Sequence, residues 1–250
     1  MAEIPKAQEQ LFDDRTSPRE KYARLVVGKR GLASLVKHEA IVLACQATPG
    51  ALGLALRKLL YPRLLGACGR NVVFGQNVVL RHPGKIRLGD NVVVDDNCLL
   101  DAKGDGNQGI RIGSGVFIGR NTILSCKNGD IEIGDRANLG FNCEVFSASR
   151  VAIGADTLLA AYCYVIGGDH EYADASVPVT AQGRRSRGIE VGDGVWMGAG
   201  AKVLDGVRVG HHAIVGAGAV VTVDVPEYAV ASGRAARIVG SRRDDAAPSE

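Results

Sequence analysis

In VGDGVWMGAGAKVLDGVRVGHHAIVGAGAVVT (residues 191–222), an apolar side chain returns at every sixth position, and this period identifies the type of fold. The returning residues are Val191, Met197, Val203, Val209, Val215 and Val221. A period of six matches neither the turn of an α-helix nor the alternation of a β-hairpin. It indicates a parallel coil in which each unit is one short strand and one corner. Three units complete one turn, from Val191 to Val209.

The same repeat runs upstream, and the places where it breaks are informative. Its members there are Leu88, Val94, Leu100, Ile112, Ile118, Leu124, Ile133, Leu139, Val145, Ile153, Leu159 and Val165. The largest break separates Ile153 from Val191 and contains GGDHEYADASVPVTAQGRRSRG (residues 167–188). Insertions in repeat proteins gather on the functional face, so we expect the site near this loop.

We therefore expect a mainly β protein with three regions. These are an N-terminal helical segment (1–70), the coil (71–228) with its protruding loop (167–188), and a C-terminal segment and tail (229–250). The helical segment would cap the open end of the coil, since a terminal coil exposes strand edges and core. An alternative is an interfacial helix that touches an anionic membrane, because Arg57, Lys58 and Arg63 stand among leucines.

Composition and charge exclude several classes of function and location. The 250 residues are 46% hydrophobic and carry a net charge of +3, which is too mild a charge to indicate nucleic-acid binding. The N-terminus shows no secretory signal, and no run is long enough to span a membrane. The six cysteines form no CxxC pair, and we expect them to pack as small reduced core residues. These features predict a cytoplasmic location, with the inner face of the membrane as the alternative.

Residues 153–237 resemble the hexapeptide-repeat acetyltransferases that modify sugar hydroxyls. The resemblance is carried by His170, the long loop, VWMGAGA (195–201), VGAGAVVT (215–222) and Arg237. That group includes the galactoside, maltose, nodulation-factor and xenobiotic acetyltransferases and acyltransferases of exopolysaccharide clusters, such as that of colanic acid. The resemblance implies a left-handed parallel β-helix. It also implies acetyl-CoA as cosubstrate, a sugar-type acceptor, no required metal, and a homotrimer whose active sites lie between subunits.

The resemblance implies that His170 is the general base. An alcohol is a poor nucleophile near pH 7, whereas imidazole titrates in that range and accepts the proton as the C–O bond forms. The backbone near Gly198 and Ala199 would stabilise the oxyanion. Trp196, the single tryptophan, would line the acyl pocket; the alternative is a buried corner filler.

Other positions match the family's cosubstrate and acceptor contacts. Those for CoA are Ala199, Ala217, Thr222, Arg234 and Arg237. Ala148 stands where galactoside-type enzymes carry an acidic acceptor-binding residue, with Asn142 as a polar candidate nearby. Arg184, Arg185 and Arg187 cluster in the loop, either as a solvated surface or as a site for phosphate on the acceptor.

Three alternatives share the coil. An N-acyltransferase that acts on a nucleotide-linked amino sugar would keep most of these residues. A non-catalytic scaffold would not need His170. A γ-carbonic anhydrase needs an H-x4-H pair of zinc ligands, whereas His211 and His212 are adjacent.

Overall fold

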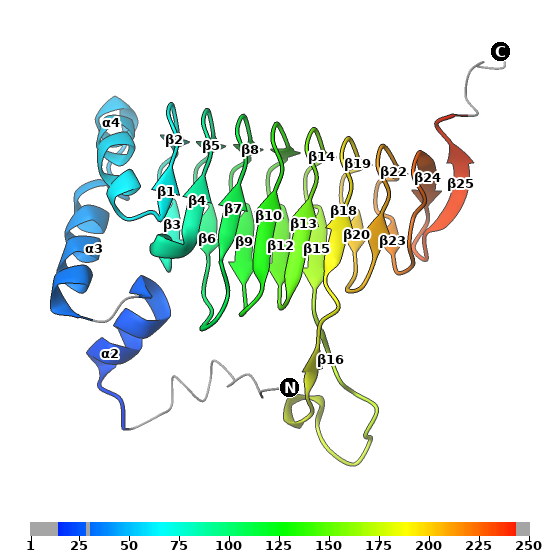
Figure 1. Cartoon of the computed structure of the whole chain (residues 1–250), viewed down its shortest axis with the longest axis horizontal. Coiled ribbons are helices and arrows are strands. Elements are labelled where there is room, and N and C mark those ends of the chain that lie inside the picture. Colours follow the sequence, from blue (N-terminus) through cyan, green and yellow to red (C-terminus); the bar gives the residue numbers. More distant parts are fainter. Residues whose placement is uncertain (1–14, 29–30, 244–250) are drawn as a thin grey trace.

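The fold is a three-sided parallel coil with helices at one end (Figure 1). In this computed structural model, residues 15–28 and 31–243 are described; the outermost parts of both expected terminal segments lie outside these ranges. Strands join the nearest strands of the neighbouring turns in parallel, so each side of the coil is one sheet. The fold is consistent with the expected left-handed β-helix, and the long loop protrudes from it as expected.

The strands belong to three sheets and one small hairpin. Sheet A contains β1 (Ala67–Cys68), β4 (Ile86–Leu88), β7 (Ile110–Ile112), β10 (Asp130–Ile133), β13 (Arg150–Ile153), β18 (Ile189–Val191) and β21 (Arg208–Val209). Sheet B contains β2 (Val73–Phe74), β5 (Val93–Val94), β8 (Phe117–Ile118), β11 (Asn138–Leu139), β14 (Leu158–Leu159), β19 (Trp196–Met197), β22 (Ile214–Val215), β24 (Ala229–Ser232) and β25 (Arg237–Ser241). Sheet C contains β3 (Val79–Arg81), β6 (Leu99–Asp101), β9 (Ile123–Cys126), β12 (Glu144–Ser147), β15 (Tyr164–Gly167), β20 (Lys202–Val203) and β23 (Val220–Val221). The hairpin pairs β16 (Asp169–His170) with β17 (Arg184–Arg185), and short 3₁₀ turns occupy Pro83–Lys85 and Val179–Ala181.

The sixfold repeat builds the core. Every repeat residue from Leu88 to Val221 is buried, and each stacks on its counterpart in the next coil, as Val145 does on Val165. Full burial of one such side chain contributes roughly 1.5–3 kcal/mol. Glycine follows many of them because the coils approach closely there. A Cβ added at Gly134 would lie 2.5 Å from the backbone nitrogen of Ala155, so any larger residue would push two coils apart.

The cysteines pack as expected. Cys45, Cys98, Cys126, Cys143 and Cys163 are buried, Cys68 is half-buried, and all six are free thiols. Burial raises the pKa of the Cys98 and Cys126 thiols to about 12, so these side chains stay protonated near neutral pH. They therefore act as small apolar residues of the core.

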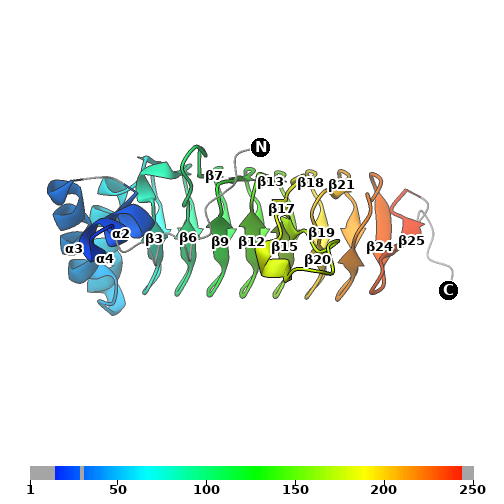
Figure 2. The same ribbon diagram turned by 90° about the horizontal axis from the view of Figure 1, so that it is seen from below.

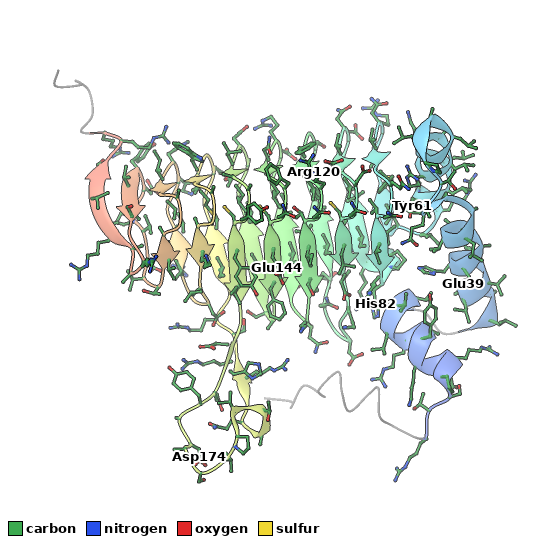
Figure 3. All side chains as sticks on the ribbon, turned by 180° about the vertical axis from the view of Figure 1, so that it is seen from behind. Glu39, Tyr61, His82, Arg120, Glu144 and Asp174 are labelled. Atoms are coloured by element: carbon green, nitrogen blue, oxygen red, sulfur yellow. The ribbon has the colours of Figure 1, made fainter. Side chains whose placement is uncertain are left out.

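The helices cover the first coil. They are α2 (Pro18–Tyr22), the π-helical turn η1 (Ala23–Val27), α3 (Leu32–Cys45), α4 (Gly50–Leu60) and the 3₁₀ turn η2 (Tyr61–Arg63). Tyr61 packs edge-on against Phe74 of the first coil and donates a hydrogen bond to the Val78 carbonyl (2.9 Å). Figures 2 and 3 show this cap at one end of the molecule, and Figure 3 shows Tyr61 between helix and coil.

The structure differs from the interfacial interpretation of α4. Arg57, expected on a basic surface, is buried and donates hydrogen bonds to the carbonyls of Phe74, Cys45 and Thr48. Its guanidinium therefore joins the cap to the coil instead of facing a lipid headgroup. Within residues 15–28 and 31–243, no helix combines the length and hydropathy that crossing a membrane requires.

Both ends of the coil extend beyond the expected boundaries. The coil begins at Ala67 instead of residue 71. The six-residue repeat is not visible in the sequence there, because Ala67 and Cys68 have small side chains. At the other end, β24 continues sheet B beyond residue 228. β25 then pairs with β24 in the antiparallel direction and covers its edge. A covered edge is protected from pairing with another chain.

Candidate functional site

The β16–β17 hairpin presents two different faces. It leaves the coil at the end of β15, and its tip, near Asp174, lies far from the sheets (Figure 3). Asp169 pairs with Arg185 across the hairpin, and their charged groups lie 3.7 Å apart. His170 pairs with Arg184. Because directly opposed residues of a hairpin point to the same side, one face carries the Asp169–Arg185 ion pair and the other carries His170 and Arg184.

His170 is held by its backbone and exposed at its side chain. Its N–H donates to the Asp169 Oδ1 at 2.8 Å, and the next N–H, of Glu171, donates to the Gly183 carbonyl. These bonds fix the strand while the side chain stays exposed. An exposed imidazole on an anchored strand can reach a substrate proton, which is what a general base requires.

A second cluster forms at the corner between sheets B and C, which we call the B–C corner. Ala199 and Ala217 are both exposed there, and the N–H of Gly218 donates to the Ala199 carbonyl (2.8 Å). The turn at 233–236 continues the row, since the Val220 N–H donates to the Gly233 carbonyl and the Ala236 N–H returns to Val220. The exposed Arg234 and Arg237 stand in or beside this turn. The structure thus brings most of the expected CoA contacts into one row.

The B–C corner also exposes backbone donors. At the corner between sheets A and B, the side chain of the next coil caps the corner N–H: Asp193 Oδ1 accepts from Ala155, and His211 Nδ1 accepts from Asp193. At the B–C corner, in the part of the chain that the structure describes, the N–H groups of Ala161, Ala199 and Ala217 have no such acceptor. Exposed amides in a row suit the carbonyls of an extended ligand or an oxyanion.

Trp196 lies on the outer face of sheet B, between Leu158 and Ile214 of neighbouring coils. Its side chain is 50% exposed, so the interpretation as a buried corner filler is wrong. Leu158 extends this exposed apolar surface by one coil, and the exposed Asn138 separates it from Phe117. Trp196 is therefore available to a ligand or to another chain at this face.

One chain does not bring all the candidate residues together. His170 follows the strands of sheet C, whereas Ala199 precedes them, so the two sites lie at opposite ends of that sheet, roughly 20 Å apart by strand geometry. Asn142 lies at the B–C corner, away from the arginines of the loop. Thr222 is exposed on the outer face of sheet C, next to β23. Within one chain, His170 and the candidate CoA contacts therefore form two separate clusters.

The three loop arginines have different surroundings. Arg185 faces Asp169, and Arg187 faces Asp205, which accepts the Arg187 backbone N–H at 2.9 Å and lies 4.0 Å from its Nε. Arg184 has no acidic partner within hydrogen-bond or ion-pair distance among the described residues. Of the three, Arg184 is the cation most available to a ligand.

Two lysines that were not among the expected site residues lie in line with this hairpin. Lys103 and Lys127 each stand three residues after a repeat residue, Leu100 and Leu124. Ala148 and Gly168 occupy the equivalent place in the next two coils. This shared offset was a usable signal, because equal offsets from the repeat place residues in one row.

Comparison with known families agrees with this geometry. The family described as bacterial transferase hexapeptide (six repeats) matches residues 188–222, and the hexapeptide repeat of succinyl-transferase matches residues 68–102. The two matches lie near opposite ends of one continuous coil. Two segments of this chain therefore match hexapeptide-repeat family models. The hexapeptide coil therefore accounts for about two thirds of the chain, from β1 to β24.

Curated relatives of this hexapeptide-repeat protein include transferases. It is 30% identical over 134 residues to the probable acetyltransferase Rv3034c of Mycobacterium tuberculosis, which covers 54% of this chain and 45% of that protein. It is 27% identical over 179 residues to the bifunctional protein GlmU of Listeria welshimeri, which covers 66% of this chain and 38% of that protein. The chain thus spans less than half the length of these relatives.

Solved structures share the coil. The polySia-specific acetyltransferase NeuO superposes with a TM-score of 0.53 at 25% identity, over 73% of this chain and 90% of that chain. The polysialic acid O-acetyltransferase OatWY gives a TM-score of 0.58 at 19% identity, over 71% and 86% of the two chains, and shows likeness of fold. Within the described residues, no group of three or more His, Cys, Asp or Glu side chains is arranged to hold a metal ion.

Proposed function

We propose that this hexapeptide-repeat protein transfers an acetyl group from acetyl-CoA to a hydroxyl of a sugar or polysaccharide precursor. The observation that carries the proposal is the exposed His170 on an anchored hairpin, combined with a separate row of exposed amides at the B–C corner. NeuO is named as a polySia-specific acetyltransferase and Rv3034c as a probable acetyltransferase, which supports acyl transfer.

The reaction needs no acyl-enzyme. His170 takes the proton of the acceptor hydroxyl as its oxygen attacks the thioester carbonyl. The resulting oxyanion accepts hydrogen bonds from corner amides such as that of Ala199. The tetrahedral intermediate then collapses, the C–S bond breaks, and the imidazolium returns its proton to the CoA thiolate. The products are the acetyl ester and free CoA.

Two chains would complete one site. Since His170 and Ala199 of one chain lie at opposite ends of sheet C, we place His170 of one subunit against the B–C corner of the next. A closed ring of three such contacts uses the same pair of surfaces three times, which gives a cyclic trimer. Trp196, on the neighbouring face of sheet B, would line the shared pocket. Its exposure allows this role.

The direct test is an assay for the free thiol of CoA with acetyl-CoA and a panel of acceptors. The panel pairs hydroxyl sugars with the matching amino sugars. We expect transfer to a hydroxyl sugar, with mass spectrometry showing an alkali-labile ester. An alkali-stable amide formed only on amino sugars would instead support the N-acyltransferase, the function of the structural relative AntD from Bacillus cereus. No transfer and no binding of acetyl-CoA would support a scaffold.

A carboxylate at the B–C corner should weaken acetyl-CoA binding. Ala217→Asp places a negative charge beside the exposed amides, where it can accept their hydrogen bonds and repel the CoA phosphates. We expect the KM for acetyl-CoA to rise about tenfold, which corresponds to about 1.4 kcal/mol. Steady-state kinetics measures it, with Ala155→Asp at the A–B corner as the matched control. Equal KM values for the two variants would contradict a CoA site at the B–C corner.

A further inference from the structure

A row of basic residues leads along the coil to the hairpin. Lys103, Lys127, Ala148 and Gly168 occupy the same corner position in four successive coils. Their backbones are linked, since Lys127 N–H donates to the Ser147 carbonyl (2.7 Å) and Ala148 N–H to the Gly167 carbonyl (2.8 Å). Adjacent coils are about 4.8 Å apart, so Lys127 stands roughly 10 Å from the base of the hairpin.

The base of the hairpin packs against the end of this row. A Cβ added at Gly168 would lie 2.9 Å from the Ala148 Cβ and 3.5 Å from the Phe146 ring. Burial has the largest effect on Lys127 and lowers its pKa. The charge of Arg184, which stands opposite His170, lowers this pKa further, and the charge of Lys103 follows. His170, Arg184 and the two lysines therefore border one surface at the edge of sheet C.

The row carries more positive charge than its carboxylates neutralise. Asp101 is nearly buried and lies 3.5 Å from Arg81 and 3.8 Å from Lys103. Glu144 is the other carboxylate whose charge acts on Lys127, and it lies on the face of sheet C (Figure 3). Four side chains therefore carry a positive charge: Arg81, Lys103, Lys127 and Arg184. Two carboxylates, those of Asp101 and Glu144, carry a negative charge. The surface keeps a net charge of two positive units.

An aromatic ring lies beside the lysines. Phe146 is half-buried on the outer face of sheet C, between Ser125 and Ile166, and the Nζ of Lys127 stands 4.9 Å from the centre of its ring. The ring holds Lys127 by a cation–π contact and presents an apolar surface against which the face of a sugar can pack. Ala148, between Phe146 and the hairpin, adds no charge; a carboxylate there would pair with Lys127.

From these contacts we infer that Lys127 and Arg184 bind an oxyanion on the acceptor, whereas Lys103 already pairs with Asp101. The acceptor is then an acidic saccharide, whose carboxylate or phosphate rests on the cations while one of its hydroxyls meets His170. This inference rests on the proposed function and assigns its substrate class. It replaces the set of three loop arginines by Arg184 and one lysine of the coil, Lys127, because Arg185 and Arg187 have acidic partners.

The test compares Lys127→Glu with Arg111→Glu, which reverses an exposed charge on sheet A, between Arg87 and Glu132 and outside the row that contains Lys127. Each variant is assayed for acetyl transfer to an oligogalacturonate, to a sugar phosphate and to a neutral oligosaccharide. We expect Lys127→Glu to lower kcat/KM for at least one anionic acceptor by about 10- to 100-fold, to leave the KM for acetyl-CoA unchanged, and to spare the neutral acceptor. Arg111→Glu should change none of these values.

Binding measured by calorimetry separates the two hypotheses. If the wild-type protein transfers acetyl groups but Lys127→Glu handles anionic and neutral acceptors like the wild type, the acidic-saccharide inference is wrong and acyl transfer stands. If no acceptor is acetylated but the oligogalacturonate or sugar phosphate binds the wild type and not Lys127→Glu, the anion site stands and acyl transfer is wrong. A loss confined to the carboxylate or to the phosphate acceptor identifies the oxyanion.

Discussion

His170→Ala should lower kcat for acetyl transfer by about 10²- to 10⁴-fold, the usual contribution of a general base. The effect is expected to be specific to chemistry, because the side chain is exposed and the hairpin is anchored by backbone bonds that alanine keeps. The KM for acetyl-CoA should stay within about twofold of the wild type, since we place the CoA site at the B–C corner of another chain. Initial rates with saturating acceptor measure the loss.

The matched control is His211→Gln, which changes another exposed histidine at a different corner. It removes a ring that accepts the Asp193 N–H, so its effect reports on local structure. Circular dichroism should be the same for both variants. A His170→Ala protein that retains half of the wild-type kcat would exclude His170 as the base.

Arg57→Met should destabilise the helical cap by about 3 kcal/mol or more, because each buried acceptor that loses its donor costs roughly 1–3 kcal/mol. The guanidinium donates to the carbonyls of Cys45, Thr48 and Phe74, at distances of 2.8, 2.8 and 3.0 Å. Methionine fills similar space but donates no hydrogen bond. The cap should therefore separate from the first coil before the remaining coils unfold.

Hydrogen exchange measures this loss locally, which suits a repeat protein whose unfolding need not be two-state. Amides of α4 and of the first coil should lose protection, while those from β18 to β23 keep it. Lys58→Met, at the exposed neighbouring position, is the control and should change little. Equal protection in the two variants would show that Arg57 does not hold the cap.

The coil was predictable because large apolar side chains mark its six-residue period. Each repeat residue from Leu88 to Val221 occupies the core position that its spacing implies. The first strand, β1, was not predictable, since the side chains of Ala67 and Cys68 are too small to mark a repeat. Arg57 and Lys58 are adjacent and both basic, so the sequence does not distinguish them. The side of α4 that packs on the coil buries Arg57, whereas Lys58 is exposed.

The candidate site was predictable in part. The interruption of the repeat after Val165 indicated where the loop leaves the coil. The pairing of His170 with Arg184 depends on the strand register of the hairpin, which the composition of the loop does not determine. The separation of His170 from Ala199 follows from the order of the sheets around the coil, which the repeat alone leaves open. Lys103 and Lys127 fall in line with the hairpin only when offsets are counted from the repeat.

Mixed oligomers test whether the active site is shared between subunits. His170→Ala chains carry an intact B–C corner, whereas chains with Ala199→Asp and Ala217→Asp carry an intact His170. The two inactive proteins are unfolded together in equal amounts, refolded and assayed. Random trimers with shared sites should recover about a quarter of the wild-type activity, since three quarters of them contain both chains and each of these has one intact site of three. Activity that stays at the level of the separate variants, although mass spectrometry shows mixed trimers, would contradict the shared site.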